Sequence, residues 1–223
     1  MKKLRLKTKR LVIEPMENEE IENLIKNTED NHLKNAYMEM LASCNNDPEH
    51  RIWYAPWKMC LKKDNTYIGD LGFKGPVDNY SVEIGYGVLK DYEGNGYTTE
   101  AVKAVVDWAY TNKDVYFVEA EVEEQNEKSK RVLEKLEFTV HGESKEGWLY
   151  VKEAPKTSWA SIYMCFGVAI GTSLGQSNNN MSMGMCLGIV FGFCIGMSLD
   201  AAEKKKREDI YKHRKDKKKK KEQ

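Results

Sequence analysis

Two glycines in the segment DYEGNGYTTEA, residues 91–101, have the type and spacing that ligand binding needs. The preceding segment VEIGYGVL, residues 82–89, predicts a buried strand, and residues 98–110 carry apolar residues at helical spacing. Gly94 and Gly96 thus lie where a strand passes into a helix. Glycine lets the backbone approach a ligand closely, and the first N–H groups of a helix attract anions. The spacing predicts a phosphate or pyrophosphate site, although a GxG turn alone is also compatible with a simple tight turn.

A second strand and a second helix follow along the chain. Residues 115–122 (VYFVEAEV) read as a strand, and residues 126–138 (NEKSKRVLEKLEF) read as a short helix. The order of strand, glycine turn, helix, strand and N-x-x-S helix resembles the GNAT family of N-acetyltransferases. The closest resemblance is to the RimJ/RimL-like branch, which acetylates ribosomal-protein N-termini and related small amines.

The resemblance covers about residues 4–152. The opening LKTKRLVIEPMENEEIENLI, residues 6–25, resembles the first strand and first helix of that branch, and IGDLGFKG, residues 68–75, resembles its third strand. The fold that this implies is α+β, with a mixed, mainly antiparallel sheet flanked by helices.

The resemblance also implies acetyl-CoA as a co-substrate. In the family, the turn amides hold the pyrophosphate, the end of the preceding strand pairs with the pantetheine arm, and the next helix adds contacts. The matching residues are Val88 on the strand, Gly94, Asn95, Gly96, Tyr97 and Thr98 at the turn, and Asn126 and Ser129 on the helix.

Two carboxylates near the turn depart from the family pattern. The family usually has Gln or Arg where this chain has Asp91, and Glu93 directly precedes the turn. Carboxylates beside a pyrophosphate weaken its binding unless they face solvent. The departure therefore puts cofactor affinity in question.

Acetyl transfer to an amine requires a group that takes a proton from the ammonium. Glu83 is the candidate, because it lies on the strand before the turn and matches a glutamate that acts as base in some members of the superfamily. A structural, salt-bridged role for Glu83 is the alternative. Glu119 and Glu121, which share one face of the next strand, are the other candidates.

The proton donor for the leaving thiolate is not specified by the pattern. Many family members use a tyrosine in the helix after N-x-x-S, but residues 130–138 contain none. Tyr86 or Tyr116 could take this role, or solvent could protonate the thiolate. The cysteines and histidines show no nucleophile elbow, triad or metal-ligand spacing, so we expect direct transfer without a metal.

Cysteine usage and charge indicate the cellular compartment and the nature of the C-terminal segment. Five cysteines without a CxxC pair, and an N-terminus without an apolar core, predict a cytoplasmic catalytic domain. Residues 203–223 carry 12 Lys and Arg against 5 Asp and Glu, which predicts a disordered basic tail. Such a tail could meet anionic lipid or RNA, but it is more often only solvated, and we do not expect nucleic acid as a partner.

A second module lies between residues 157 and 199, where no charged residue occurs. The polar segment QSNNN, residues 176–180, divides it into apolar stretches at 159–174 and 181–199. Glycines recur at four-residue spacing along both, as Gly167, Gly171 and Gly175, and as Gly184, Gly188, Gly192 and Gly196. On a helix such glycines share one narrow face, where a second backbone can approach closely. The pattern resembles glycine-zipper helical hairpins.

The length and flanks of this module favour a membrane. At 1.5 Å per residue the two stretches span roughly 24 and 28 Å, close to a hydrocarbon core of about 30 Å. Lys156 and residues 204–207 flank the same side, which predicts cytoplasmic ends, and Trp159 and Tyr163 suit an interface. We expect lipid as a partner and self-association through the glycines. A soluble oligomer, or packing against the catalytic domain, is the alternative.

The resulting hypothesis has four segments. Residues 1–152 form the N-acetyltransferase domain, 153–157 a linker, 158–199 a membrane-inserted hairpin, and 200–223 the basic tail. The expected function is direct transfer of acetyl from acetyl-CoA to a primary amine, either a peptide N-terminus or a small amine, at the cytoplasmic membrane. The alternative is an inactive, acetyltransferase-like binding or scaffold protein.

Overall fold

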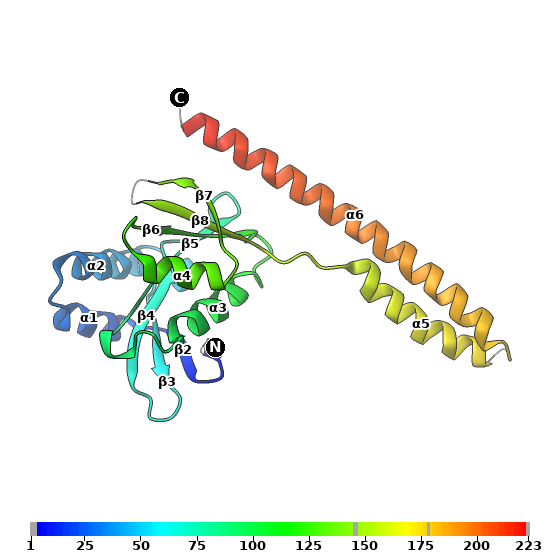
Figure 1. The fold of residues 1–223 in the computed structure, drawn as a ribbon, viewed down its shortest axis with the longest axis horizontal. Coiled ribbons are helices and arrows are strands. Elements are labelled where there is room, and N and C mark those ends of the chain that lie inside the picture. Colours follow the sequence, from blue (N-terminus) through cyan, green and yellow to red (C-terminus); the bar gives the residue numbers. More distant parts are fainter. Residues whose placement is uncertain (1–3, 145–146, 178, 222–223) are drawn as a thin grey trace. The chain divides into compact units, whose positions relative to one another are not determined.

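The computed structural model describes residues 4–144, 147–177 and 179–221 (Figure 1). The chain divides into two compact units, Met1–Ala154 and Pro155–Gln223.

The N-terminal unit is built on one eight-stranded sheet with the order β1-β2-β3-β4-β5-β6-β8-β7. The strands are β1 (Leu6–Lys7), β2 (Leu11–Pro15), β3 (Trp57–Leu61), β4 (Tyr67–Phe73), β5 (Ser81–Val88), β6 (Phe117–Val122), β7 (Thr139–Glu143) and β8 (Trp148–Glu153). All neighbouring strands are antiparallel except β5 and β6, which are parallel. The expected mixed, mainly antiparallel sheet is confirmed.

Four helices accompany the sheet: α1 (Asn18–Asn27), α2 (Asn31–Asn46), α3 (Tyr97–Ala109) and α4 (Glu127–Lys135). Short segments of 3-10 helix lie at η1 (Pro48–Trp53) and η2 (Lys90–Tyr92). Because side chains alternate along a strand, those of β5 point to both faces of the sheet. Val82 and Ile84 are buried in the main core, which also contains the apolar residues of α3. A second, smaller core around Ile21 and Tyr37 belongs to α1 and α2.

A bulge in β4 sets the relation between β4 and β5. Met59 pairs with Gly69 but Cys60 pairs with Tyr67, so β4 holds one extra residue at this point. Gly69 has φ +146°, and a Cβ there would overlap the carbonyl oxygen of Gly87 and come 2.8 Å from Cα of Val88. Only glycine fits this close approach, so Gly69 fixes how β4 lies against the end of β5.

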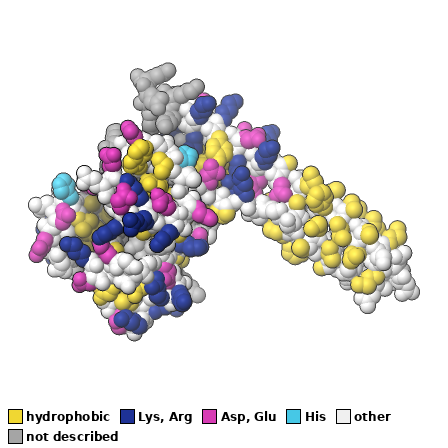
Figure 2. Space-filling view, viewed as in Figure 1, with side chains coloured by type: hydrophobic (Ala, Val, Ile, Leu, Met, Phe, Trp, Pro, Cys, Tyr) yellow, Lys and Arg dark blue, Asp and Glu magenta, His cyan; other side chains and the backbone are white. Residues whose placement is uncertain are grey.

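The C-terminal unit is a pair of helices, α5 (Trp159–Ser177) and α6 (Met181–Lys221). Both glycine series face the partner helix: a Cβ on Gly167 or Gly188 would overlap the carbonyl of the other, and Gly171 and Gly184 are related in the same way. The large apolar side chains lie on the outside instead, with Phe166 61% and Phe191 67% exposed. Figure 2 shows the resulting apolar surface along this unit.

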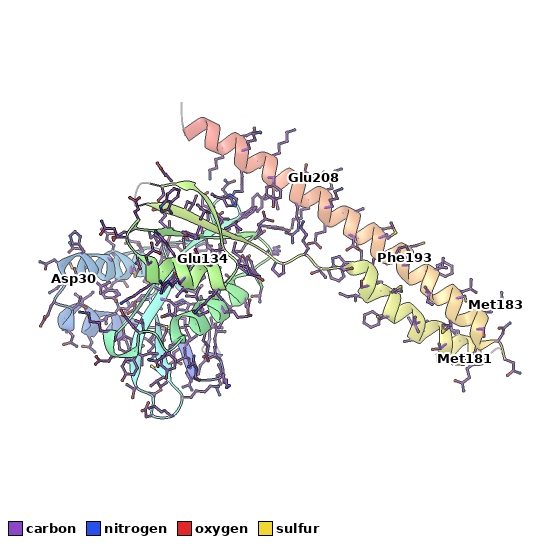
Figure 3. The ribbon with its side chains drawn as sticks, viewed as in Figure 1. Asp30, Glu134, Met181, Met183, Phe193 and Glu208 are labelled. Atoms are coloured by element: carbon purple, nitrogen blue, oxygen red, sulfur yellow. The ribbon has the colours of Figure 1, made fainter. Side chains whose placement is uncertain are left out.

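Polar residues close both ends of the helix pair. The Asp200 carboxylate accepts hydrogen bonds from the backbone amides of Trp159 at 2.7 Å and Ala160 at 3.1 Å, which caps α5 from across the pair. At the turn, Asn180 caps α6 by accepting from the amide of Met183 at 3.1 Å. Figure 3 labels Met183 at this end. Asn178, part of the expected polar turn, lies outside the described residues.

The expected disordered tail at 200–223 differs from the structure, in which α6 continues to Lys221. Ala, Glu, Lys and Arg are strong helix formers, and extending an existing helix avoids the cost of nucleation. The Glu203 carboxylate also pairs with Arg207 one turn later, at 3.1 Å. The charged segment is helical because it continues the apolar helix that precedes it. Residues 222 and 223 lie outside the described residues.

The close approach at Gly69 predicts a large effect of a single methyl group. Gly69→Ala should lower the free energy of unfolding by about 2–4 kcal/mol, because it adds backbone strain and overlap with β5. Gly85→Ala is the matched control, since Gly85 lies on β5 with open space around its Cβ position. Denaturant unfolding of both variants measures the difference, and equal stabilities would contradict this view of the bulge.

Candidate active site

The parallel strands β5 and β6 separate partway along their length. Their pairing runs from Ser81 opposite Phe117 to Glu83 opposite Glu119 and ends there. Beyond this point β5 continues along β4 as far as Val88, while β6 continues along β8. The second half of β5 therefore presents a backbone edge that β6 does not cover.

The hydrogen-bond alternation shows which β5 groups line this edge. The Glu83 carbonyl accepts from the amide of Lys74, directly after β4, and the amide of Leu89, directly after β5, donates to Ile68 of β4. The carbonyl of Tyr80, directly before β5, instead accepts from amides at the start of β6. Polar groups alternate along a strand, so those of Tyr86 and Val88 point toward the uncovered side. An extended chain with amide groups could pair with them as an added strand.

The glycine turn lies at the end of this edge. Gly94 and Gly96 have φ +72° and +75°, and Gly96 is the residue that caps α3. The space at the Gly94 Cβ position is open. The first amides of α3, at Tyr97 and Thr98, precede the helix's own hydrogen bonds, so they are free to meet an anion.

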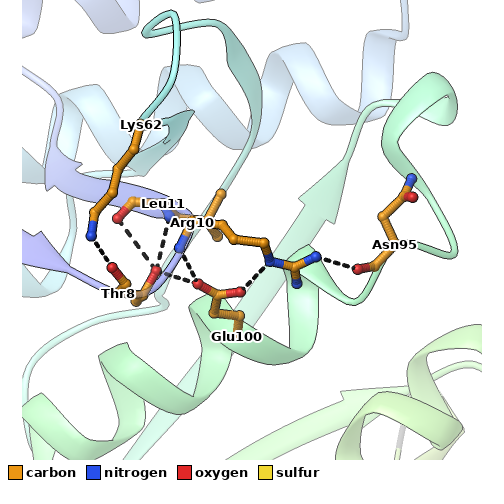
Figure 4. A network of polar contacts seen from close by, with 6 residues as sticks. All are labelled: Thr8, Arg10, Leu11, Lys62, Asn95 and Glu100. Atoms are coloured by element: carbon orange, nitrogen blue, oxygen red, sulfur yellow. Dashed lines mark hydrogen bonds and ion pairs between the residues drawn. The ribbon is translucent and has the colours of Figure 1, made fainter.

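Arg10 holds the turn in place (Figure 4). Its guanidinium donates to the Asn95 carbonyl at 2.9 Å and to the Glu100 carboxylate at 2.7 Å, and it lies 4.4 Å from the centre of the Tyr97 ring. Glu100 also accepts from Thr8 at 2.6 Å. These charge-assisted bonds lower the pKa of Glu100 below its ordinary value despite partial burial, which raises it. The network ties β2 to the turn and to α3.

The two carboxylates that depart from the family pattern are placed differently. Asp91 is exposed on η2, where solvent screens its charge. Glu93 forms an ion pair with Lys128 of α4. The ion pair with Lys128 thus offsets the charge of Glu93, and Arg10 adds a guanidinium that contacts the turn at Asn95.

The helix α4 faces this region through its first turn. Asn126 caps the helix by accepting from the Ser129 amide at 3.0 Å, so its side chain has a structural role here. The Tyr86 hydroxyl donates to the Ser129 carbonyl at 3.3 Å. Burial raises the pKa of Tyr86 to about 12, so the phenol is protonated at neutral pH and able to donate a proton. Tyr116, the other candidate, makes an edge contact with Tyr80.

A cleft of about 630 Å³ opens on the α1–α2 side of β4 and β5. Gly72, Gly85 and Gly87 lie on its floor, and the end of α1, the following loop and α2 form its wall. Among the described lining residues, three are acidic and one is basic, namely Glu29, Asp30, Asp70 and Lys74. Asp30, which caps α2 by accepting from the His32 amide at 2.8 Å, is labelled in Figure 3.

Of the three glutamates that the sequence offers as a base, two have polar partners. Glu83 forms an ion pair with Lys74 at 2.5 Å. Glu119 accepts from the Ser81 hydroxyl at 2.8 Å. Glu121 is half-buried on the same face of β6. The contact of Glu83 is the salt bridge expected for the structural alternative.

Sequence reasoning missed two residues of this region, Arg10 and Asp70. Asp70 lies directly opposite Gly87 and accepts hydrogen bonds from the hydroxyls of Tyr37 at 2.8 Å and Tyr67 at 2.5 Å. The sequence feature that could have indicated Asp70 is a single aspartate in an otherwise apolar strand, IGDLGF. No group of three potential metal ligands occurs within the described part of the chain.

The arrangement combines three functions in one place. The uncovered β5 edge can hold an amide-containing arm, and the turn can hold an anion at the start of α3. The cleft on the other face has room for a second molecule beside the same strand. The glycine turn therefore fits the pyrophosphate of acetyl-CoA. The uncovered β5 edge fits its pantetheine arm.

Comparisons with known proteins agree with this geometry. The model of the acetyltransferase (GNAT) domain matches residues 9–139, more than half of the chain. An uncharacterized N-acetyltransferase of Bacillus subtilis, YjdG, is 37% identical over 95 residues, which are 41% of this chain and 56% of that protein. An uncharacterized N-acetyltransferase of Bacillus licheniformis, p20, is 31% identical over 109 residues, 48% of this chain and 58% of that protein. The chain thus spans about half the length of these relatives.

Solved structures share the fold. The ribosomal-protein-S5-alanine acetyltransferase of Vibrio fischeri aligns with a TM-score of 0.55 at 17% identity, over 67% of this chain and 96% of that one. A GNAT-family acetyltransferase of Bacillus anthracis aligns with a TM-score of 0.52 at 19% identity, over 67% and 98%. The matched domain, the separated β5 and β6 strands and the glycine turn lead to one conclusion: the chain belongs to the GNAT family of acetyltransferases.

Proposed function

We propose that the protein is an acetyl-CoA-dependent N-acetyltransferase that transfers acetyl directly to a primary amine. The observation that carries the proposal is the uncovered edge of β5 leading into the glycine turn. This edge would pair with the pantetheine amides through Tyr86 and Val88. The amides from Gly94 to Thr98 would hold the pyrophosphate, with Arg10 fixing the turn.

The cleft on the α1–α2 face is the proposed acceptor site. It meets the same strand that would hold the thioester, and its excess of carboxylates favours a cationic acceptor such as an ammonium group. A carboxylate on this face takes the proton of the ammonium. Glu83, the sequence candidate, and Asp70 both lie on this face.

Departure of the thiolate requires a proton. Tyr86 is the side chain that could supply it, because its protonated hydroxyl lies between β5 and α4. Asn126 contributes by forming α4, and Ser129 by anchoring the Tyr86 hydroxyl. Solvent remains the alternative donor.

The alternative is an inactive scaffold protein. Its support is Asp91 at the turn, the missing tyrosine in the helix after N-x-x-S, and the unassigned base. Asp91, however, is exposed, and the neighbouring Glu93 is paired with Lys128. These contacts favour a retained cofactor site.

For the C-terminal unit we propose insertion of the α5–α6 pair into the cytoplasmic membrane. Within the described residues, one helix, α6 over Met181–Lys217, is long and apolar enough to cross a bilayer. The 19 residues of α5 span about 28 Å, near the thickness of the hydrocarbon core. Its large apolar side chains face outward and its glycines inward, the reverse of a soluble helix pair.

The charges of this unit agree with the proposal. The charged residues Asp200, Glu203 and Arg207 lie at one end of the helix pair. At this end α5 begins, and the basic part of α6 follows. This end would remain at the cytoplasmic surface. Because all seven glycines already face the partner helix within one chain, self-association through them would require the pair to open. Lipid is therefore the proposed partner.

Acetyl transfer can be tested with the full-length protein and a peptide that carries a free N-terminal alanine. We expect saturable acetyl-CoA binding by titration calorimetry and release of thiol with this peptide. The same peptide with a blocked N-terminus should release none. Saturable binding without thiol release from any primary amine would favour the scaffold alternative instead.

The role of Arg10 predicts a loss of cofactor affinity. Arg10→Gln should weaken coenzyme A binding by about 10-fold, because a charge-assisted bond worth at least about 1.4 kcal/mol no longer fixes the turn. Lys103→Gln is the control. It also removes a cation, but the exposed ion pair that it breaks joins two residues of α3, Lys103 and Asp107. Equal affinities in the two folded variants would show that Arg10 does not position the turn.

Membrane insertion predicts how the protein fractionates. Full-length protein should stay in the membrane fraction through high salt and carbonate and leave it only with detergent, whereas a chain ending at Ala154 should be soluble. Gly188→Leu should remain in the membrane, because leucine is more lipophilic, but should separate α5 from α6. A full-length protein that is monodisperse in buffer without detergent would refute insertion.

A further inference from the structure

We propose that Asp70, held by Tyr37 and Tyr67, is the carboxylate that binds the acceptor ammonium and takes its proton. This inference rests on the proposed acetyl transfer and assigns a catalytic residue to it.

The position of Asp70 follows from the β4 bulge. Gly69 lies opposite Val88, and Asp70 lies opposite Gly87 on the face that carries the cleft. Asp70 therefore neighbours the stretch of β5 whose other edge would hold the thioester. Gly85 and Gly87 leave this floor open, because a Cβ at either position would meet nothing within 4 Å. An acceptor can reach Asp70 along the glycine floor.

The contacts of Asp70 leave one oxygen for a ligand. Tyr37 and Tyr67 come from different elements, α2 and β4, and both hydroxyls donate to the same atom, Oδ2. The second oxygen, Oδ1, receives neither bond and can accept from an ammonium. Two donors on Oδ2 also fix the carboxylate plane, which orients Oδ1.

The surroundings make Asp70 more basic than an ordinary aspartate. Burial raises its pKa, and the hydrogen bonds from Tyr67 and Tyr37 oppose this only in part. A general base works best when its pKa approaches the working pH. The pKa values of both tyrosines are themselves raised, chiefly by burial, so they remain donors.

Two charged groups near Asp70 have partners of their own. Lys58 lies opposite it on β3 but forms ion pairs with Glu14 and Glu20. Asp30 caps α2. The titratable and charged groups that face Asp70 or share its cleft are Tyr37, Tyr67, Lys58, Glu29, Asp30, Lys74, Glu83 and Tyr86.

Glu83 is the less suitable of the two carboxylates. It lies on the same face, but the ammonium of Lys74 contacts its Oε1 at 2.5 Å. An acceptor ammonium would have to compete with this lysine. Asp70 has neutral hydroxyl partners instead, and no such competition arises.

The proton balance of the reaction is then complete. The ammonium gives one proton to Asp70 and becomes a neutral amine. Its nitrogen forms the C–N bond as the C–S bond breaks, and the second proton that the nitrogen loses balances the one taken up by the thiolate. Asp70 releases its proton to solvent, so one ammonium and one acetyl-CoA yield one amide, one coenzyme A and one proton.

Two small acceptors of nearly the same shape separate proton removal from other roles. Ethylamine is protonated at neutral pH, whereas 2,2,2-trifluoroethylamine is largely neutral and needs no base. In the full-length protein, Asp70→Asn should reduce kcat/KM for ethylamine by about 100-fold or more and reduce that for trifluoroethylamine far less. Glu83→Gln should affect both amines alike.

Tyr67→Phe provides a second readout that does not remove the carboxylate. Without this hydrogen bond the pKa of Asp70 should rise, so the acidic limb of the kcat/KM profile should move to higher pH. In Asp70→Asn that limb should disappear, and the rate should instead follow the fraction of free amine.

The outcomes distinguish this inference from the function on which it rests. Equal losses for the two amines in Asp70→Asn, or an amine-dependent loss in Glu83→Gln instead, would overturn the role of Asp70 while leaving acetyl transfer intact. A wild-type protein that binds acetyl-CoA but releases no thiol with either amine or with the alanine peptide would overturn both. Circular dichroism and acetyl-CoA binding confirm that each variant is folded.

Discussion

The separation of β5 from β6 after Glu83 is the constraint on which the site depends. A strand inside a sheet has both backbone edges bonded, and it cannot bind another extended chain. Here β5 keeps β4 on one edge and loses β6 on the other, so its last residues hold polar groups that a ligand can satisfy. The glycine turn and α3 then follow at the end of the same strand.

The bulge at Gly69 supports this arrangement from the opposite edge. Because Gly69 lies against Gly87 and Val88 without a side chain, β4 stays bonded to β5 along the part that β6 has left. The same bulge sets Tyr67 and Asp70 within hydrogen-bonding distance. One glycine thus supports both the proposed cofactor edge and the proposed acceptor face.

Local sequence patterns indicate the glycine turn and the N-x-x-S helix, which are the local parts of the proposed site. Gly94 and Gly96 were identifiable because a strand and a helix adjoin them, and the N-x-x-S segment because Asn126 caps its own helix. Arg10 and Asp70 could not be found in this way, since their partners come from distant positions and, for Asp70, from an irregular register. The ion pair of Glu83 with Lys74 likewise depends on strand pairing. The composition of the segment beyond Asp200 predicts disorder. The segment is helical because it extends the apolar helix before it.

Amide hydrogen exchange of the full-length protein, with and without coenzyme A, tests the central claim most directly. If the uncovered edge and the turn form the cofactor site, coenzyme A should slow exchange at the amides of Tyr86 and Val88 and in the first turn of α3, at Tyr97 and Thr98. The amide of Leu89, directly after β5, already bonds to Ile68 of β4 and should change little. Saturable binding with protection confined to other segments, or no protection at Val88 and Tyr97, would contradict the account.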